Sequence, residues 1–200
     1  MHTAHRCRAF WIKIPGYEQQ ATCPMCGCDE SMEHIITECH ASGQSIIWGL
    51  VHELLTKKGI PQHGVPTFGQ VLRCGLTDFR DASCKKQVGC NRLYTIAVSE
   101  STYLIWRIRC EWRIEREENQ EKLHTKDEIM GRWLAMINMR LKLDCLMTDE
   151  RHYDHKAIDP KLVQRTWDGV LHDEQGLPDN WVAESGVLVA TRAEHPPGHN

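Results

Sequence analysis

The chain has 200 residues with a formal net charge of −3, and 41% of its residues are hydrophobic. This length allows one ordinary domain with a proper core, or a small module attached to a larger one. A dedicated DNA-binding domain usually has a strongly basic composition. The slightly acidic net charge of this chain therefore gives no indication of one.

The sequence carries no signal for export or membrane insertion. Its start, MHTAHRCRAFWIKIPGYEQQ, lacks an apolar core of signal-peptide length, and the chain has no run of about 18 apolar residues. We therefore expect an intracellular protein, nuclear or cytoplasmic, with no membrane partner. The ten cysteines are then kept reduced, which favours metal binding over a disulfide framework. HRCRAFWIKIP resembles the end of a helix whose start is missing, so we also expect a fragment of a longer protein.

Hydrophobic periodicity predicts a mainly α fold with three parts. They are a small zinc-binding knuckle module (1–41), a helical domain built as a bundle (42–172) and an irregular C-terminal segment (173–200). Within them, short helices are predicted at 5–14, before Pro15-Gly16, and at about 67–73 in a loop region. A longer helix is predicted from about residue 45 to Gly59, which stops it.

The longest predicted helix spans about residues 88–118. One set of residues spaced three or four apart predicts its core face, and a second set on neighbouring positions widens that face. Arg107, Arg109 and Arg113 are diluted by neighbouring glutamates, so a solvated surface is the favoured interpretation of these arginines. The first set is Ile96, Ser99, Tyr103, Trp106, Cys110 and Ile114, and the second is Leu93, Ala97, Leu104, Ile108 and Trp112.

Two further helices have clear start signals. Thr125 and Glu128 form a T-x-x-E capping box that opens a helix to about residue 147. Asp159-Pro160 combines an N-cap with proline at the first helical position, so a last helix is predicted to about residue 171. Trp181 is expected to anchor the C-terminal segment, where GVLVATR could add a strand and AEHPPGHN is expected to be disordered. The core face of the 125–147 helix is predicted as Ile129, Trp133, Ile137 and Leu141.

Residues 23–40, CPMCGCDESMEHIITECH, hold four cysteines and two histidines. Cys23-Pro-Met-Cys26-Gly has the spacing of a knuckle, in which a tight turn brings both sulfurs to one ion. His34 and Cys39 supply a second pair, and three thiolates with one imidazole suit tetrahedral Zn²⁺. Four protein ligands leave no open position for a metal-bound water. We therefore expect one structural zinc ion rather than a hydrolytic one.

The short helix in this stretch constrains the ligands. Ser31 is a predicted cap for a helix from Met32 onward. Because four residues separate His34 from Cys39, the two cannot share one helical face, so Cys39 is expected where this helix ends.

Other residues could take part in the same site. Cys28 lies two positions after Cys26 and His40 is next to Cys39, so either is an alternative ligand, and Cys7 could reach in from the preceding helix. Unliganded thiols in a loop are the alternative interpretation of the whole stretch. The other cysteines are assigned no role, with Cys110 on an apolar helical face and no paired spacing for Cys74, Cys84, Cys90 and Cys145.

At CPMCGCDESMEHIITEC the sequence resembles the zinc-binding module at the C-terminal end of reverse transcriptases of non-LTR retrotransposons. That module has the form C-P-x-C, a short acidic stretch, then E-H-[ILF]-[IFL]-x-x-C. Over about residues 5–192 the frame also resembles fungal retrotransposon-derived reverse transcriptase or RNase H domain proteins, through IIWGL, ESTYLIWRIRCEWRI, RWLAMINMRLKLD and LPDNWVAESGVLV. The matching positions of the module are Cys23, Pro24, Cys26, Glu33, His34, Ile35, Ile36 and Cys39.

The resemblance implies a parent element with polymerase and RNase H activity, yet the sequence lacks the motifs for both. It contains no Y-x-D-D motif and no carboxylate set of the RNase H type. We therefore expect a non-catalytic zinc-binding tail with no small-molecule substrate. Glu100, among apolar residues of the longest helix, is the strongest remaining acid–base candidate, and a hydrogen-bonded core residue is its simpler interpretation.

Two functions remain for such a tail. In the first, Arg6, Arg8, Trp11 and Lys13 assist binding of RNA or DNA, because positive charge binds phosphates and flat rings stack on bases. In the alternative interpretation of these residues, Phe10 and Trp11 pack against the zinc module and the basic side chains are merely solvated. The second function is a zinc-pinned protein-interaction module or purely structural remnant, which the acidic charge and the Trp-rich helices favour.

Overall fold

The computed structural model describes residues 7–61 and 64–190. Over this part the chain is mainly helical, as predicted, and its strand-like pairing is confined to isolated bridges without a sheet. No described helix is long and apolar enough to cross a bilayer. The helices are α1 (Arg8–Trp11), α2 (Gln44–Lys57), α3 (Phe68–Leu72), α4 (Val88–Ile114), α5 (Lys126–Leu146), α6 (Glu150–Tyr153) and α7 (Pro160–Trp167), joined by loops and short turns.

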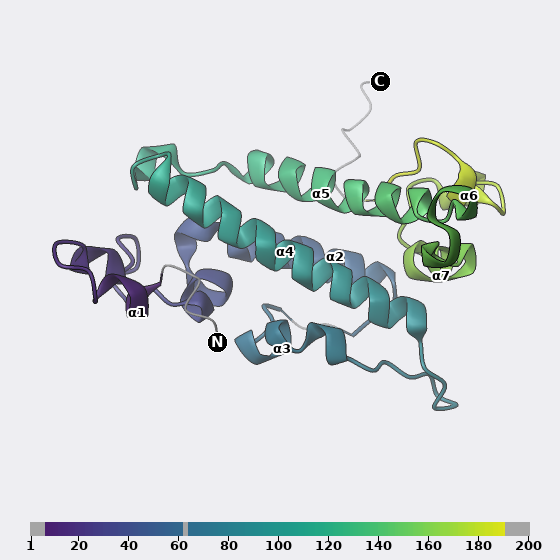
Figure 1. Cartoon of the computed structure of the whole chain (residues 1–200), viewed down its shortest axis with the longest axis horizontal. Helices are drawn as coiled ribbons and strands as arrows, with labels where there is room; N and C mark the ends of the chain where they lie inside the picture. Colours follow the sequence, from purple (N-terminus) through teal and green to yellow (C-terminus); the bar gives the residue numbers. More distant parts are fainter. Residues whose placement is uncertain (1–6, 62–63, 191–200) are drawn as a thin grey trace, which may run out of the picture.

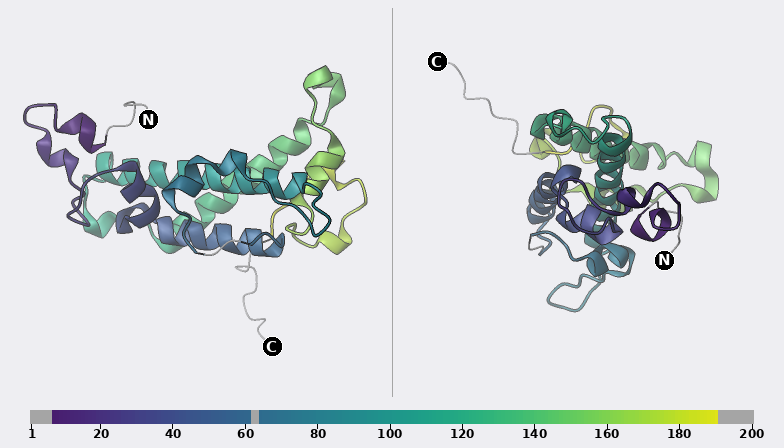
Figure 2. Two further views of the ribbon diagram at one scale, coloured as in Figure 1. Left: turned by 90° about the horizontal axis from the view of Figure 1, so that it is seen from below. Right: turned by 90° about the vertical axis from the view of Figure 1, so that its left-hand side faces the viewer.

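Helix α4 runs along the molecule and is the element on which the others pack (Figure 1). α2 and α5 lie along it, and α7 packs against its N-terminal part. The segment that carries α1 lies at one end of the elongated bundle and α6 at the other (Figure 2). The cysteine-rich stretch therefore meets the C-terminal half of α4, far from α6 and α7.

The contact between α4 and α7 needs a glycine. A Cβ atom placed on Gly89 would lie 1.9 Å from the carbonyl oxygen of Arg165. Backbone can approach backbone this closely only where the side chain is a hydrogen atom. Gly89 therefore sets the distance between the two helices.

The buried face of α4 is broader than the predicted stripe and differently centred. In the first predicted set, Tyr103 is 57% and Ile114 is 73% exposed, whereas Ile105 and Ile108 are fully buried. Because α2, α5 and α7 surround this helix, burial extends to adjacent positions and no single stripe describes it. The predicted face was therefore wrong at Tyr103 and Ile114 and missed Ile105, while the second set is buried throughout, at Leu93, Ala97, Leu104, Ile108 and Trp112.

The two N-caps and the α5 face agree with the sequence, but of the predicted capping box only the Thr125 half is recorded, and the Glu128 carboxylate accepts from Arg116 and Arg132. The Thr125 hydroxyl accepts from the Glu128 amide at 3.2 Å, and the Asp159 carboxylate accepts from the Lys161 amide at 2.9 Å. The predicted face of α5 is buried, with exposures of 2% or less at Ile129, Trp133, Ile137 and Leu141.

Helix α4 ends at Ile114, before the predicted residue 118. Glu117 and Glu118 follow with φ of 54° and 58°, in the left-handed region that breaks a helix. α7 ends at Trp167 for a similar reason, since Gly169 has φ +82°.

The C-terminal segment packs against the helical bundle, at Trp181 and Val189. Trp181 is 5% exposed, as expected of an anchor, and its indole N–H donates to the Asp168 carboxylate at 3.1 Å. Val189 pairs with Leu171 in one isolated antiparallel bridge, which is all that GVLVATR contributes to strand structure in the described residues. The expected disorder of AEHPPGHN lies outside the described residues. Ile35 of the cysteine-rich stretch belongs to the same core cluster as these C-terminal residues.

A fully buried carboxylate, Asp144, joins three helices. It accepts from the Arg92 guanidinium of α4 at 2.8 Å and from the Trp167 indole of α7 at 2.8 Å, and it lies on α5. Its exposed fraction is 0%. A buried charge is tolerated only when it is paired and hydrogen-bonded, and these donors meet that condition.

Asp144→Ala should destabilise the protein by about 3–5 kcal/mol, because it leaves the partly buried Arg92 guanidinium and the buried Trp167 N–H without their acceptor. Urea unfolding measures this change in the free energy of unfolding. Asp127→Ala, on the exposed first turn of α5, is the matched control and should cost less than about 1 kcal/mol. If both substitutions had equally small effects, Asp144 would not be the buried contact that joins the three helices.

A second charged network joins the C-terminal end of α4 to the start of α5. The Arg132 guanidinium donates to Glu111 at 2.9 Å and to Glu128 at 2.8 Å, and Arg116 donates to Glu128 at 2.8 Å. The hydrogen bonds from Arg132 lower the pKa of Glu111 to about 2, from an ordinary value of 4.5. Burial lowers the pKa of His124, which lies beside these carboxylates.

Because the pKa of Glu111 is depressed in the folded state, its contribution to stability is present above its ordinary pKa of 4.5 and is lost as pH falls towards 2. Glu111→Gln should lower the free energy of unfolding by of the order of 1 kcal/mol at neutral pH, since the pair is partly exposed and screened. The difference from wild type should shrink between about pH 5 and pH 3. Glu115→Gln at the exposed end of α4 is the control, and a difference independent of pH would be the contrary result.

Candidate metal centre

The first half of the centre is the turn that carries Cys23 and Cys26. The Gly27 amide donates to the Cys23 carbonyl at 2.8 Å, and the Cys23 amide donates to the Cys28 carbonyl at 2.8 Å. Gly27 has φ +70°, a conformation that a residue with a Cβ atom rarely adopts. These bonds close the knuckle that the C-x-x-C-G spacing predicts.

The second half is carried by a π-helix, η2 (His34–Glu38). Met32 and Glu33 lead into it as a helical turn, and Ser31 caps this turn as predicted, because its hydroxyl accepts from the His34 amide at 3.0 Å. The Cys39 amide donates to the His34 carbonyl at 2.7 Å, which is the i→i+5 bond of a π-helix. The wider turn returns residue i+5 to the side of residue i. Cys39 lies just past the end of the helix, as predicted, and still reaches the same point as His34.

The two halves converge. The ligand atoms of Cys23, Cys26, His34 and Cys39 all lie within 4.8 Å of one another, so this cluster could hold a metal ion. The Cys23 and Cys39 sulfurs are 3.8 Å apart, and both residues are fully buried. A tetrahedral ion with metal–sulfur bonds of about 2.3 Å places two sulfurs about 3.8 Å apart. The spacing of the donors therefore fits such an ion.

The alternative ligands lie differently. Cys28 is exposed, but its sulfur is 3.2 Å from Nδ1 of His34, so it borders the cluster. His40 is exposed. Cys7 is half-buried and packs against the main helical core.

Burial raises the pKa of the Cys39 thiol well above its ordinary value, while the nearby Arg109 guanidinium acts in the opposite direction. A buried thiol is ionised readily only when a cation replaces its proton, and a metal ion does this. The cluster is therefore suited to hold thiolates only together with positive charge.

Arg109 supplies part of that charge and was assigned wrongly from the sequence. It is 1% exposed, not solvated as predicted, and its Nη2 lies 2.8 Å from the Glu30 carboxylate and 3.5 Å from the Cys23 sulfur. Glu30 is itself 3% exposed and received no role from the sequence. One signal could have located Arg109: Ile105, Ile108 and Trp112 surround it on the helix at positions i−4, i−1 and i+3.

The residues predicted to bind nucleic acid lie mostly on the projecting α1 segment. Arg6 lies outside the described residues. Arg8 is ion-paired with Asp29, and Lys13 is exposed. Trp11 is half-buried and stacks on Tyr17, with ring centroids 6.0 Å apart. The structure thus places Trp11 beside another aromatic ring and engages the charge of Arg8 within the module.

Glu111, His124 and Glu128 form a second group whose donors lie close enough to share a metal ion. The His124 side chain is 1% exposed, and its Nε2 lies 3.3 Å from Glu111. The guanidinium groups of Arg116 and Arg132 already balance both carboxylates. A divalent cation would meet that positive charge, so this group is better described as an ion-pair network between α4 and α5.

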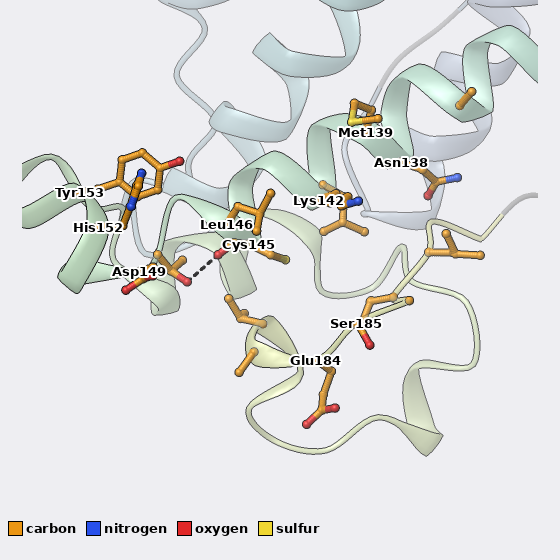
Figure 3. A pocket seen from close by; sticks show the side chains of 18 residues that line it. Asn138, Met139, Lys142, Cys145, Leu146, Asp149, His152, Tyr153, Glu184 and Ser185 are labelled. Carbon is orange, nitrogen blue, oxygen red and sulfur yellow. Dashed lines mark hydrogen bonds between the residues drawn. The ribbon is translucent and has the colours of Figure 1, made fainter.

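An open pocket of about 940 Å³ lies at the far end of the bundle, between α5, α6 and residues 182–188. Figure 3 shows Met139 and Lys142 of α5 on one wall and Glu184 and Ser185 on the segment opposite. Asp149, at its edge, is used to cap α6, because its carboxylate accepts from the Arg151 amide at 3.0 Å. The surface that lines the pocket is mainly apolar.

Comparisons of the chain with protein-family models, with curated proteins and with solved structures gave no match. The resemblance to reverse transcriptase zinc-binding modules therefore stays a prediction.

Proposed function

We propose that this chain is a non-catalytic helical binding module whose N-terminal segment is fixed by one structural Zn²⁺. The convergence of Cys23, Cys26, His34 and Cys39 on one point carries this proposal. Zinc accepts three thiolates and one imidazole in a closed tetrahedron, and the 3.8 Å sulfur separation matches that geometry. A closed site leaves no position for an activated water.

The position of the site supports a structural role. Cys23, Cys39 and Ala41 form a small buried cluster with Trp112 of α4, separate from the main core. A core of this size stabilises little by itself, and small domains of this kind depend on metals or disulfides. The ion would thus hold the knuckle against α4.

The purified protein should contain one zinc ion per chain by elemental analysis. Cys39→Ser should lose the ion, because it removes a buried ligand, whereas Cys28→Ser should keep it, because that thiol borders the site without completing it. Chelation should lower the thermal midpoint and expose residues 7–41 to protease.

A zinc content far below one per chain that Cys39→Ser leaves unchanged would contradict the metal site. Equal losses in Cys28→Ser and Cys39→Ser would contradict the ligand assignment alone.

One observation favours a nucleic acid as the partner, in line with the resemblance to retrotransposon proteins. The stacked Trp11–Tyr17 pair projects from the bundle with Tyr17 53% exposed and Lys13 exposed nearby in sequence. Aromatic platforms with adjacent positive charge bind single strands by stacking and phosphate contact. A protein partner is the other candidate, because the pairing of Arg8 with Asp29 reduces the free positive charge.

Single-stranded RNA and DNA should bind at low salt and dissociate as salt is raised. Tyr17→Ala should weaken binding by about 1–3 kcal/mol through lost stacking, and Lys13→Ala should reduce the salt slope by about one. Lys142→Ala, at the far end of the bundle, is the control. Fluorescence anisotropy that detects no complex at low salt would reject a nucleic-acid partner and leave the protein-interaction function.

A further inference from the structure

Arg109 has more hydrogen-bonding capacity than its protein partners use. Its Nη2 donates to Glu30 and to the Cys23 sulfur, while Nε and Nη1 have no hydrogen-bond partner among the described residues. Its guanidinium carbon lies 5.0 Å from the centroid of the Trp112 ring, which closes one side of the group. A cation buried in this way needs more negative charge nearby than a single shared carboxylate provides.

Glu30 alone does not balance this charge. The Glu30 carboxylate is also 3.3 Å from Nη1 of Arg113, so two guanidinium groups share one carboxylate. Arg113 has other acceptors, since it also donates to the Gln20 side chain at 2.6 Å. For Arg109 the remaining acceptor is the sulfur of Cys23.

With a zinc ion bound at the four ligands, the site would supply the negative charge that Arg109 lacks. Three thiolates and one Zn²⁺ leave a single net negative charge on a Cys₃His site, and that charge would lie directly against Arg109. A hydrogen bond from N–H to a metal-bound thiolate disperses its charge and orients the ligand.

We propose that Arg109 is a positioning residue of the metal centre, donating to the Cys23 thiolate and supplying its counter-charge from α4. This inference rests on the proposed function, since it requires a metal at the four ligands. Through Arg109, metal binding is coupled to the longest helix of the bundle. By reciprocity, changes in the packing of α4 alter metal affinity.

The test compares zinc affinities by competition with a chromophoric chelator. Arg109→Met combined with Glu30→Gln removes both charges and keeps side-chain length, so no unpaired carboxylate is left to prevent folding. This double variant should bind Zn²⁺ about 10–100-fold more weakly than Glu30→Gln alone, the range found when outer contacts of a metal ligand are lost. Arg109→Lys in the Glu30→Gln background should recover part of the loss, because it keeps the charge but not the fork.

Arg113→Met in the Glu30→Gln background is the matched control on the same helix, since Arg113 also pairs with Glu30 but donates to Gln20 and to the Thr22 carbonyl rather than to the Cys23 sulfur. It should change zinc affinity far less. Co²⁺ provides a second readout. The sulfur-to-cobalt absorption band should shift in the double variant, whereas loss of a purely structural ion pair would leave that band in place.

The outcomes separate the two proposals. If wild type binds neither Zn²⁺ nor Co²⁺, the proposed function fails and this inference fails with it. If wild type binds one equivalent and the double variant matches Glu30→Gln in affinity and cobalt spectrum, the metal site stands and the role of Arg109 is rejected.

Discussion

The buried guanidinium of Arg109 connects the cysteine-rich stretch to the rest of the molecule. It reaches from α4 to Glu30 and to Cys23, so the longest helix and the candidate metal centre share one charged contact. The ring of Trp112 covers the same guanidinium and packs in the cluster with Cys23 and Cys39. Arg109 therefore holds the knuckle against α4 together with Arg113, which also contacts Glu30 and donates to the Gln20 and Thr22 carbonyls.

Buried arginine–carboxylate pairs occur at both ends of α4. Near its start, Arg92 reaches Asp144 of α5, and near its end, Arg109 reaches Glu30 of the knuckle. Replacing such pairs by apolar residues is often neutral for stability, because desolvation offsets the attraction. Breaking one partner is costly. A physical role consistent with both facts is to define which elements meet α4 and in what register, since a mispaired arrangement would leave a charge buried alone.

In the candidate centre, local backbone geometry brings together donors whose spacing does not suit an α-helix. His34 and Cys39 are five positions apart, which on an α-helix places them on different sides. The π-helix His34–Glu38 adds residues to the turn and returns Cys39 to the side of His34. The turn at Gly27 brings the Cys23 and Cys26 sulfurs to the same side. The π-helix and this turn thus bring together four donors that belong to separate short segments.

What the sequence by itself determined is local. The spacing of Cys23, Cys26, His34 and Cys39, the caps at Thr125 and Asp159 and the face of α5 depend on interactions within a few residues, and the structure agrees with each of them. Only the tertiary structure decided the burial of Arg109, its pairing with Glu30, the displaced face of α4 and the ion pair of Arg8 with Asp29. The physical reason is that exposure of a charged side chain depends on which distant element covers it, and that partner is not encoded in the neighbouring residues. The convergence of the four candidate donors could be predicted because metal chemistry constrains their spacing, and their surroundings could not.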